Sequence, residues 1–374
     1  GMSYRVVAEL SREIEAYLRH KAQGSCRELF FRFVHDQIVE YLQQRTPPAE
    51  QSLWHYRIAM HQYRSSLSSS KANEQVFSIA NHLNQGAHHL IQDGKAELLI
   101  QLNARACRLS LDSVAYVSAY SYFERAHKMV QEHHWQDDYF GILQLYIDGI
   151  EAASLSDNHA MAENLFYKVL ERCLGLGEKI ELYTIIIRMH TNLNHMEKGI
   201  DLAAQALSLT GEDLPSGPEA IAAGIGEQSQ EIAALAAGLP GGIEDYANMP
   251  PMEDEMIQAA MEIMINVSST AYMTDANLYM YIVLRMVSLS LQHGSSNVSA
   301  FGFVNYALVL AGAYGDYANG YRYGLAALAL LAKHPNPELG CKVNHVFGAG
   351  IQHWKNHIRS CIPYFEKAYL NGVQ

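Results

Sequence analysis

The sequence predicts an all-α protein, and three observations lead to this prediction. Apolar residues recur at the spacing of an amphipathic helix almost throughout the chain. One such stripe runs through Leu182, Ile185, Ile186, Met189 and Leu193. Runs of alternating apolar and polar residues, which would indicate strands, are absent from the sequence. The chain has 374 residues but only 10 prolines, and short polar turns such as residues 156–158 mark the expected helix ends.

A short turn recurs before the second helix of each expected hairpin. Its anchor residue is Val114, Asp157, Asn194 or Gly315, and a weaker copy lies at Lys355. A small residue follows five positions after an anchor, where it would let the two helices approach closely; examples are Ala162, Gly199 and Gly320. Nine positions after an anchor stand the residues expected to contact the next hairpin, Phe166, Ala203 and Gly324.

The spacing of these turns indicates a repeat protein. The anchors lie 43, 37, 121 and 40 residues apart, and the long interval corresponds to about three units. A period of roughly 34–40 residues with a small residue at the helix crossing is typical of tetratricopeptide repeats. A single hairpin cannot bury its apolar face alone, so the units must stack. The sequence therefore predicts a tetratricopeptide-like α-solenoid of stacked helical hairpins.

The chain is expected to divide into four parts. Residues 1–70 form N-terminal helices, residues 71–210 a first helical repeat array, and residues 252–374 a second one. Between the two arrays, residues 211–251 form an acidic insert that is rich in Pro and Gly and contains a helical pattern at 219–239.

The net charge of −12 is concentrated in one segment of the chain. Residues 199–284 contain no Lys or Arg, yet they contain 13 Asp and Glu residues. A nucleic-acid-binding protein needs Lys and Arg to replace counterions along the phosphates, and this sequence has no basic block. We therefore expect no nucleic-acid partner. The acidic segment is either a solvated surface or a docking face for a basic partner.

One stretch, residues 287–315, contains no Lys, Arg, Asp or Glu. Its apolar part after the polar residues 292–297 covers only 300–315, whereas a membrane span needs about 20 residues. We interpret the stretch as two buried helices joined by a polar turn. The sequence therefore predicts no membrane insertion.

Signatures of catalysis and cofactor binding are absent from the sequence. It contains neither the glycine-rich phosphate loop of nucleotide-binding enzymes nor a C-x-x-C pair. Its five widely spaced cysteines, which are typical of a reducing cytoplasm, are Cys26, Cys107, Cys173, Cys341 and Cys361. His353 and His357 lie four residues apart without the H-E-x-x-H pattern of zinc enzymes. We expect a cytoplasmic protein that is not an enzyme and needs no cofactor or metal.

The repeat pattern also predicts a binding surface. In a tetratricopeptide hairpin the first helix lines the concave face, and its exposed positions fall ten, six, three and two residues before the anchor. The candidate binding residues at these positions are Glu151, Arg188, Thr191, Asn192, Asn305, His345, Gln352 and His353. Guanidinium and amide groups can hold an extended peptide backbone or a carboxylate. The alternative is that these side chains only face solvent.

Several runs of sequence resemble one known family. Residues 29–42 read LFFRFVHDQIVEYL, which is similar to the segment that closes the ATPase module of large bacterial signalling proteins. Residues 77–86 read FSIANHLNQG, similar to an I-x-N-x-L-N-x-G element of that family. Residues 135–207 resemble its paired-helix repeats, and MVSLSLQHG at 286–294 resembles its [MV]-x-L-[ST]-L-x-[HY]-G run. Further similar runs begin at Gly315 and His353.

The family is that of the bacterial STAND-type, predicted-ATPase multidomain kinases. In this family an ATPase module precedes a tetratricopeptide-like region, and GAF or PAS sensors with a histidine kinase or diguanylate cyclase follow it. The resemblance implies that residues 1–70 correspond to the end of an ATPase module. It implies that the chain is a fragment of a larger bacterial signalling protein, which we prefer to a stand-alone relative.

The resemblance and the absent motifs favour a non-catalytic regulatory module. Such a module binds a protein or peptide partner, or a small-molecule effector, and relays binding to covalently linked ATPase and output domains. A second hypothesis is a stand-alone adaptor that binds a peptide in its groove. A third, from another class, is an enzyme with a cryptic pocket.

Overall fold

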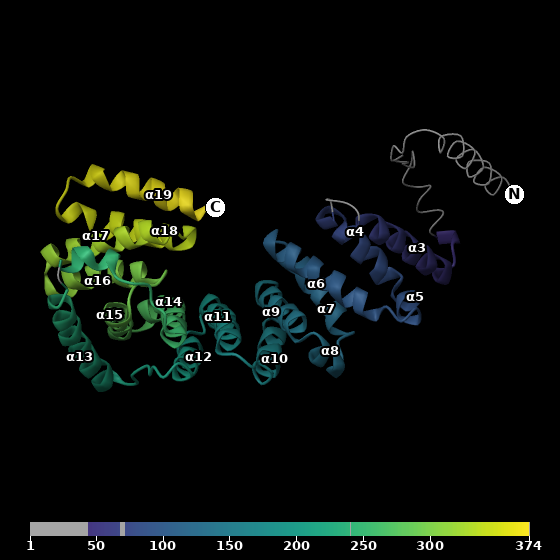
Figure 1. The fold of residues 1–374 in the computed structure, drawn as a ribbon, viewed down its shortest axis with the longest axis horizontal. Helices are drawn as coiled ribbons and strands as arrows, with labels where there is room; N and C mark the ends of the chain where they lie inside the picture. Colours follow the sequence, from purple (N-terminus) through teal and green to yellow (C-terminus); the bar gives the residue numbers. More distant parts are fainter. Residues whose placement is uncertain (1–43, 68–71, 240, 374) are drawn as a thin grey trace. The chain divides into compact units, whose positions relative to one another are not determined.

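The structure is a computed structural model, and it describes residues 44–67, 72–239 and 241–373 (Figure 1). These residues are mostly helical and contain no β-strand; one isolated bridge joins Pro251 and Ser295. The all-α prediction is therefore confirmed for the described part of the chain. The run at 29–42, which resembles the end of an ATPase module, lies outside the described residues.

The chain divides after Lys95 into two compact units. In the first unit, α3 (Pro48–Ser66) packs against α4 (Ala72–Gln85) and α5 (Ala87–Gln92). A Cβ atom at Gly86 would lie 2.7 Å from the backbone nitrogen of Tyr56. Glycine is therefore required where the α4–α5 junction crosses α3.

The second unit begins with three helical hairpins and a short helix between the first two (Figure 1). These elements are α6 (Ala96–Asp112), α7 (Tyr116–His127), α8 (Glu132–Asp137), α9 (Tyr139–Leu155), α10 (His159–Leu170), α11 (Leu176–Asn192) and α12 (Met196–Ser208). The partners within each hairpin pack directly on one another, α6 on α7, α9 on α10 and α11 on α12.

The rest of the second unit continues with longer helices. They are α13 (Pro218–Ala237), the 3₁₀ turn η1 (Ile243–Asn248), α14 (Glu255–Thr274), α15 (Ala276–His293), α16 (Ser299–Tyr314), α17 (Tyr317–Lys333), α18 (Pro337–Gly350), the 3₁₀ turns η2 (Gln352–Trp354) and η3 (Ile358–Cys361), and α19 (Ile362–Gly372). The uncharged stretch at 287–315 thus contributes to two buried helices, as predicted. Within the described residues, no helix is both long enough and apolar enough to cross a membrane.

The recurring turns share one backbone conformation. Val114, Asp157, Asn194 and Gly315 all adopt positive φ angles, between 59° and 68°. The N–H after the first three of them returns to a carbonyl five residues earlier, at distances of 2.8 to 3.0 Å. This is the Schellman arrangement, which satisfies free carbonyls at the end of a helix. Lys355 differs, with φ of −115°, so the weakest of the predicted turns does not have this geometry.

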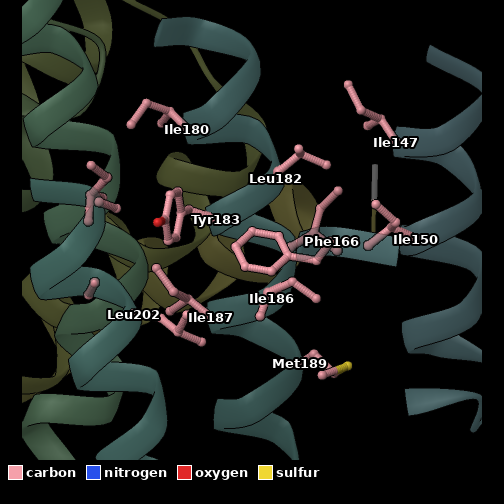
Figure 2. Close-up of a cluster of buried hydrophobic side chains, with 14 of the residues drawn as sticks. Ile147, Ile150, Phe166, Ile180, Leu182, Tyr183, Ile186, Ile187, Met189 and Leu202 are labelled. Carbon is pink, nitrogen blue, oxygen red and sulfur yellow. The ribbon is translucent and has the colours of Figure 1, made fainter. Parts of the chain in front are cut away.

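The small residues after these turns are buried at helix crossings. Ala162, Gly199 and Gly320 all have little or no exposure to solvent. A Cβ atom at Gly320 would lie 2.8 Å from the carbonyl oxygen of Ala307, so glycine allows α17 to cross α16 closely. Phe166 is also buried, and Figure 2 shows it between the side chains of α9 and α11.

Val114 is a β-branched residue in a conformation that suits glycine. The left-handed region costs an L-residue roughly 1–2 kcal/mol, whereas glycine enters it freely. We expect Val114→Gly to raise the free energy of unfolding by about 1 kcal/mol, measured by urea denaturation. Val117, which is also exposed but lies inside α7, is the control. Val117 is the second residue of α7, so the same change there should lower stability by at most about 0.5 kcal/mol. Destabilisation by Val114→Gly would contradict this account of the turn.

The acidic segment 211–251 is part of the core of the second unit. Its helix α13 packs along α15, and η1 packs against α17. The buried hydroxyl of Tyr246 donates to the backbone carbonyls of Ser290, at 2.6 Å, and Gly294, at 3.1 Å. The predicted helical pattern at 219–239 agrees with α13.

Several acidic residues of this segment pair with basic residues of the chain itself. Arg285 binds both carboxylate oxygens of Glu212, at 2.7 and 2.8 Å. Glu231 accepts a hydrogen bond from Ser288 at 2.6 Å, and Glu244 pairs with Arg322 at 2.8 Å. These carboxylates therefore attach the segment to α15 and α17. This part of the segment is neither a plain solvated surface nor a free docking face.

Candidate interaction site

A pocket of about 290 Å³ lies where α9 meets α11 in the second unit. We call it the α9–α11 pocket. Its lining residues are Tyr116, Glu151, Ser154, Leu155, His159, Ile185, Arg188, Met189, Asn192 and Leu193. Three of the candidate residues from the sequence, Glu151, Arg188 and Asn192, come together here.

Helical periodicity places these polar groups on one side of each helix. In α9, Glu151 and Ser154 are three residues apart, and both line the pocket. In α11, Arg188 and Asn192 are four residues apart, so they project from the same face. Both are exposed, whereas the residues between them are mostly buried.

The guanidinium of Arg188 makes a long ion pair and is exposed, so its N–H groups can donate to a ligand. One guanidinium nitrogen lies 3.7 Å from a carboxylate oxygen of Glu151, and the Arg188 side chain is 52% exposed. The Lys342 ammonium lowers the pKa of Glu338 most strongly, and the positive charge of Arg188 adds to this effect. Arg188 therefore lies within the electrostatic reach of carboxylates on both α9 and α18.

A buried carboxylate extends this charged surface toward α6. Asp148 accepts hydrogen bonds from Arg108, at 3.1 Å, and from Gln144, at 2.9 Å. Burial raises the pKa of Asp148, and these two donors partly oppose that effect. Burial also raises the pKa of Glu181, with smaller contributions from the charges of Asp148 and Glu151. Carboxylates therefore gather along the facing sides of α9 and α11.

Three other candidate residues make contacts inside the fold. The hydroxyl of Thr191 lies 2.6 Å from that of Thr270 and links α11 to α14. Asn305 and Gln352 are buried, so the expectation that they are exposed was wrong. The side chain of Gln352 accepts a hydrogen bond from the Tyr321 hydroxyl at 3.3 Å and donates one to the Ser360 hydroxyl at 3.1 Å. Tyr279 of α15 contacts Asn305, and Tyr321 of α17 contacts Gln352. The repeat spacing does not reveal these contacts with other elements.

The two candidate histidines are exposed and lie outside the α9–α11 pocket. His345 projects from α18 with its ring 5.9 Å from that of Phe365, and it lines a second pocket together with Asn305. His353 lies beside Trp354 in η2. The described residues contain no group of three or more His, Cys, Asp or Glu side chains that could hold a metal ion.

Sequence reasoning missed several residues of the α9–α11 pocket. Ile185 and Met189 belong to the apolar stripe that was assigned to the core, and their burial is consistent with that role. Tyr116 and His159 come from the second helices α7 and α10, and the pattern of the first helices gave no signal for them. Only the packing of neighbouring hairpins brings these residues to the pocket.

Two buried cysteines show no reactive character. Burial raises the pKa of the Cys107 thiol to about 12 and that of Cys173 to about 11. Thiols are nucleophiles only as thiolates, so these two are inert at neutral pH. Cys361 is also buried and free.

Comparison with known proteins finds a distant similarity to a signalling protein. Over 329 residues it is 21% identical to "Hybrid signal transduction histidine kinase G" of Dictyostelium discoideum. The alignment covers 80% of this chain but only 9% of that protein, so the chain spans about a tenth of its relative. No protein-family model matches the chain. No solved structure gives a significant match.

Proposed function

We propose that this chain is a non-catalytic regulatory and protein-interaction module of a larger signalling protein. The similarity to a hybrid histidine kinase supports the signalling context, because it covers most of this chain and a small part of that protein. The module would relay the binding of a partner to linked ATPase and output domains in the cytoplasm. The mostly helical build of the described residues is compatible with such a module.

The hairpins of the second unit are proposed to stack in the tetratricopeptide manner. Support comes from the left-handed turn residues Val114, Asp157 and Asn194, which end α6, α9 and α11 at spacings of 43 and 37 residues. The buried small residues Ala162 and Gly199 follow two of these turns at the same distance. The same local geometry at a repeating interval is what a helical repeat requires.

The α9–α11 pocket is proposed to bind an extended peptide of the partner. The observation that carries this proposal is that Arg188 and Asn192 present exposed donors from one face of α11 beside Glu151. Such donors can hold main-chain carbonyls, while apolar Ile185 and Met189 contact a side chain. The carboxylates of Glu151 and Glu181 favour a peptide with a basic residue next to the clamp.

A peptide selection tests this role and needs no identified partner. Peptides are selected on the full chain by phage display, and their affinity is measured by calorimetry. We expect the double variant Arg188→Ala, Asn192→Ala to bind at least about ten-fold more weakly, since two donors to the ligand are lost. The matched control is Arg125→Ala with Asn164→Ala, which removes the same side chains from exposed positions on α7 and α10.

The affinity of the control should stay within two-fold of the original. If the folded double variant binds selected peptides as tightly as the original chain, the α9–α11 pocket is not the peptide site. A stand-alone adaptor that binds a peptide in the same pocket is the alternative. The length of the open reading frame separates the two hypotheses, because an adaptor would not be followed by kinase or cyclase motifs.

The competing hypothesis of an enzyme makes a different prediction. We expect the purified chain to release no phosphate from ATP above the level of a buffer blank, because its sequence has no phosphate-binding loop. A malachite green assay measures this directly. ATP turnover that is lost on a point mutation within the chain would contradict the non-catalytic role.

A further inference from the structure

A second pocket of about 490 Å³ lies in the C-terminal part of the second unit and shares no lining residue with the α9–α11 pocket. We call it the tyrosine pocket. It is lined by Ser268, Ser269, Tyr272, Met273, Tyr279, Phe301, Asn305, Leu308, His345 and Val346, which come from α14, α15, α16 and α18. Its volume falls within the range of pockets that hold small molecules.

The lining of the tyrosine pocket is apolar and carries no Asp, Glu, Lys or Arg side chain among the described residues. This contrasts with the charged surface around Arg188. Tyr272 and Met273 at the end of α14 are 70% and 67% exposed, although both are large and apolar. Exposed apolar side chains grouped beside a pocket indicate a ligand contact. The ring of Tyr272 meets that of Tyr279 edge to face, at 5.2 Å between centroids.

Asn305 is a buried amide in the lining of this apolar pocket. The Asn305 side chain is 4% exposed, and its amide nitrogen donates to the carbonyl oxygen of Phe301 at 2.8 Å. Its carbonyl oxygen accepts from the hydroxyl of Tyr279 at 2.7 Å. An Asn amide has two N–H donors and two acceptor lone pairs. Each of these two atoms has a partner among the described residues, and the amide has the capacity for one further donated and one further accepted hydrogen bond.

We propose that the tyrosine pocket binds an uncharged aromatic small molecule that carries an amide-like edge. The aromatic and aliphatic side chains take the ring system, and the remaining donor and acceptor of Asn305 match the amide. A charged ligand is disfavoured because no Asp, Glu, Lys or Arg side chain among the described residues lines the pocket and burial of an unpaired charge is costly. This proposal does not depend on the peptide-binding role of the α9–α11 pocket, since the two pockets share no residue.

Three naphthalene probes test the chemistry of the pocket on the full chain. 2-Naphthamide is the matching probe, 2-naphthoate adds a negative charge, and 2-acetylnaphthalene keeps the carbonyl but lacks the N–H donors. Affinities are measured by ligand-observed NMR titration. We expect 2-naphthamide to bind with a dissociation constant below about 1 mM, as suits a fragment of its size. It should bind at least about ten-fold more tightly than 2-naphthoate.

Variants locate the binding. Ser269→Trp places a large side chain at the exposed side of the pocket, and we expect it to weaken 2-naphthamide binding at least ten-fold. Ser216→Trp, at an exposed position that does not line the pocket, is the matched control and should leave binding within two-fold. The original chain should bind 2-naphthamide more tightly than 2-acetylnaphthalene, and Asn305→Ala should bind the two probes equally.

The thermal unfolding transition of each variant is recorded first. If Asn305→Ala does not fold, the probe series with the original chain and Ser269→Trp still decides the question. No binding of 2-naphthamide, equal binding of 2-naphthoate, or unchanged binding in folded Ser269→Trp would overturn the proposal.

Discussion

Gly149→Ala is expected to lower the free energy of unfolding by about 3 kcal/mol, close to the upper end for overpacked cores. A Cβ atom at Gly149 would overlap the ring of Phe123, which is 2% exposed. That ring cannot move aside easily, because it stacks on His127 at 5.4 Å and meets Tyr146 edge to face at 5.7 Å. Accommodating the methyl group would therefore force α7 and α9 apart.

The control for this variant is another glycine in a helix. An added Cβ at Gly226 in α13 would meet nothing within 4 Å. Alanine is the better helix former, so Gly226→Ala should raise stability by up to about 1 kcal/mol. Both variants are measured by urea denaturation followed by circular dichroism. Equal effects of the two changes would show that helix propensity, and not close packing of α7 on α9, determines the result.

Arg285→Ala is expected to destabilise the second unit by about 3 kcal/mol. The side chains of Arg285 and Glu212 are only 19% and 11% exposed, and the guanidinium binds both carboxylate oxygens. Removing Arg285 leaves Glu212 charged, buried and without its partner, which is costly in proteins. Glu231, which lies 3.8 Å from Arg285, would lose a favourable charge as well.

A second ion pair of the acidic segment 211–251, which joins η1 to α17, is the matched control. Arg322 pairs with Glu244, but the two side chains are 45% and 52% exposed. Solvent screens such a pair, so Arg322→Ala should cost at most about 1 kcal/mol. The double variant Arg285→Ala, Glu212→Ala should cost less than the two single changes added together, since neither charge is then left alone. Additive effects would contradict the assignment of a coupled buried pair.

The local structure of the repeats followed from the sequence because it depends on short-range chemistry. Polar or glycine residues at Asp157, Asn194 and Gly315 tolerate the left-handed turn that ends a helix, and small residues follow where helices cross. Residue type alone would not have predicted the turn at Val114, because valine does not favour a left-handed conformation. Its position was inferred from spacing, and the structure gives it the same φ as the others.

The candidate binding residues were predicted less well, because exposure depends on elements far away in the sequence. Arg188 and Asn192 are exposed, as the helix pattern predicted, and they line the α9–α11 pocket. Asn305 and Gln352 occupy comparable positions in their hairpins, yet they are buried. Tyr279 donates a hydrogen bond to Asn305, and Tyr321 donates one to Gln352. Neither contact follows from the spacing within a hairpin.

The sequence by itself determined the helical class, the recurring turns and the absence of known catalytic motifs, because periodicity, turn chemistry and short motifs are local properties. Tertiary structure alone decided how the acidic segment 211–251 is used. Its carboxylates suggest a free charged surface, but Arg285 and Arg322 lie 73 and 78 residues away from Glu212 and Glu244. A charge pattern does not show which distant residue folding will bring within hydrogen-bonding distance.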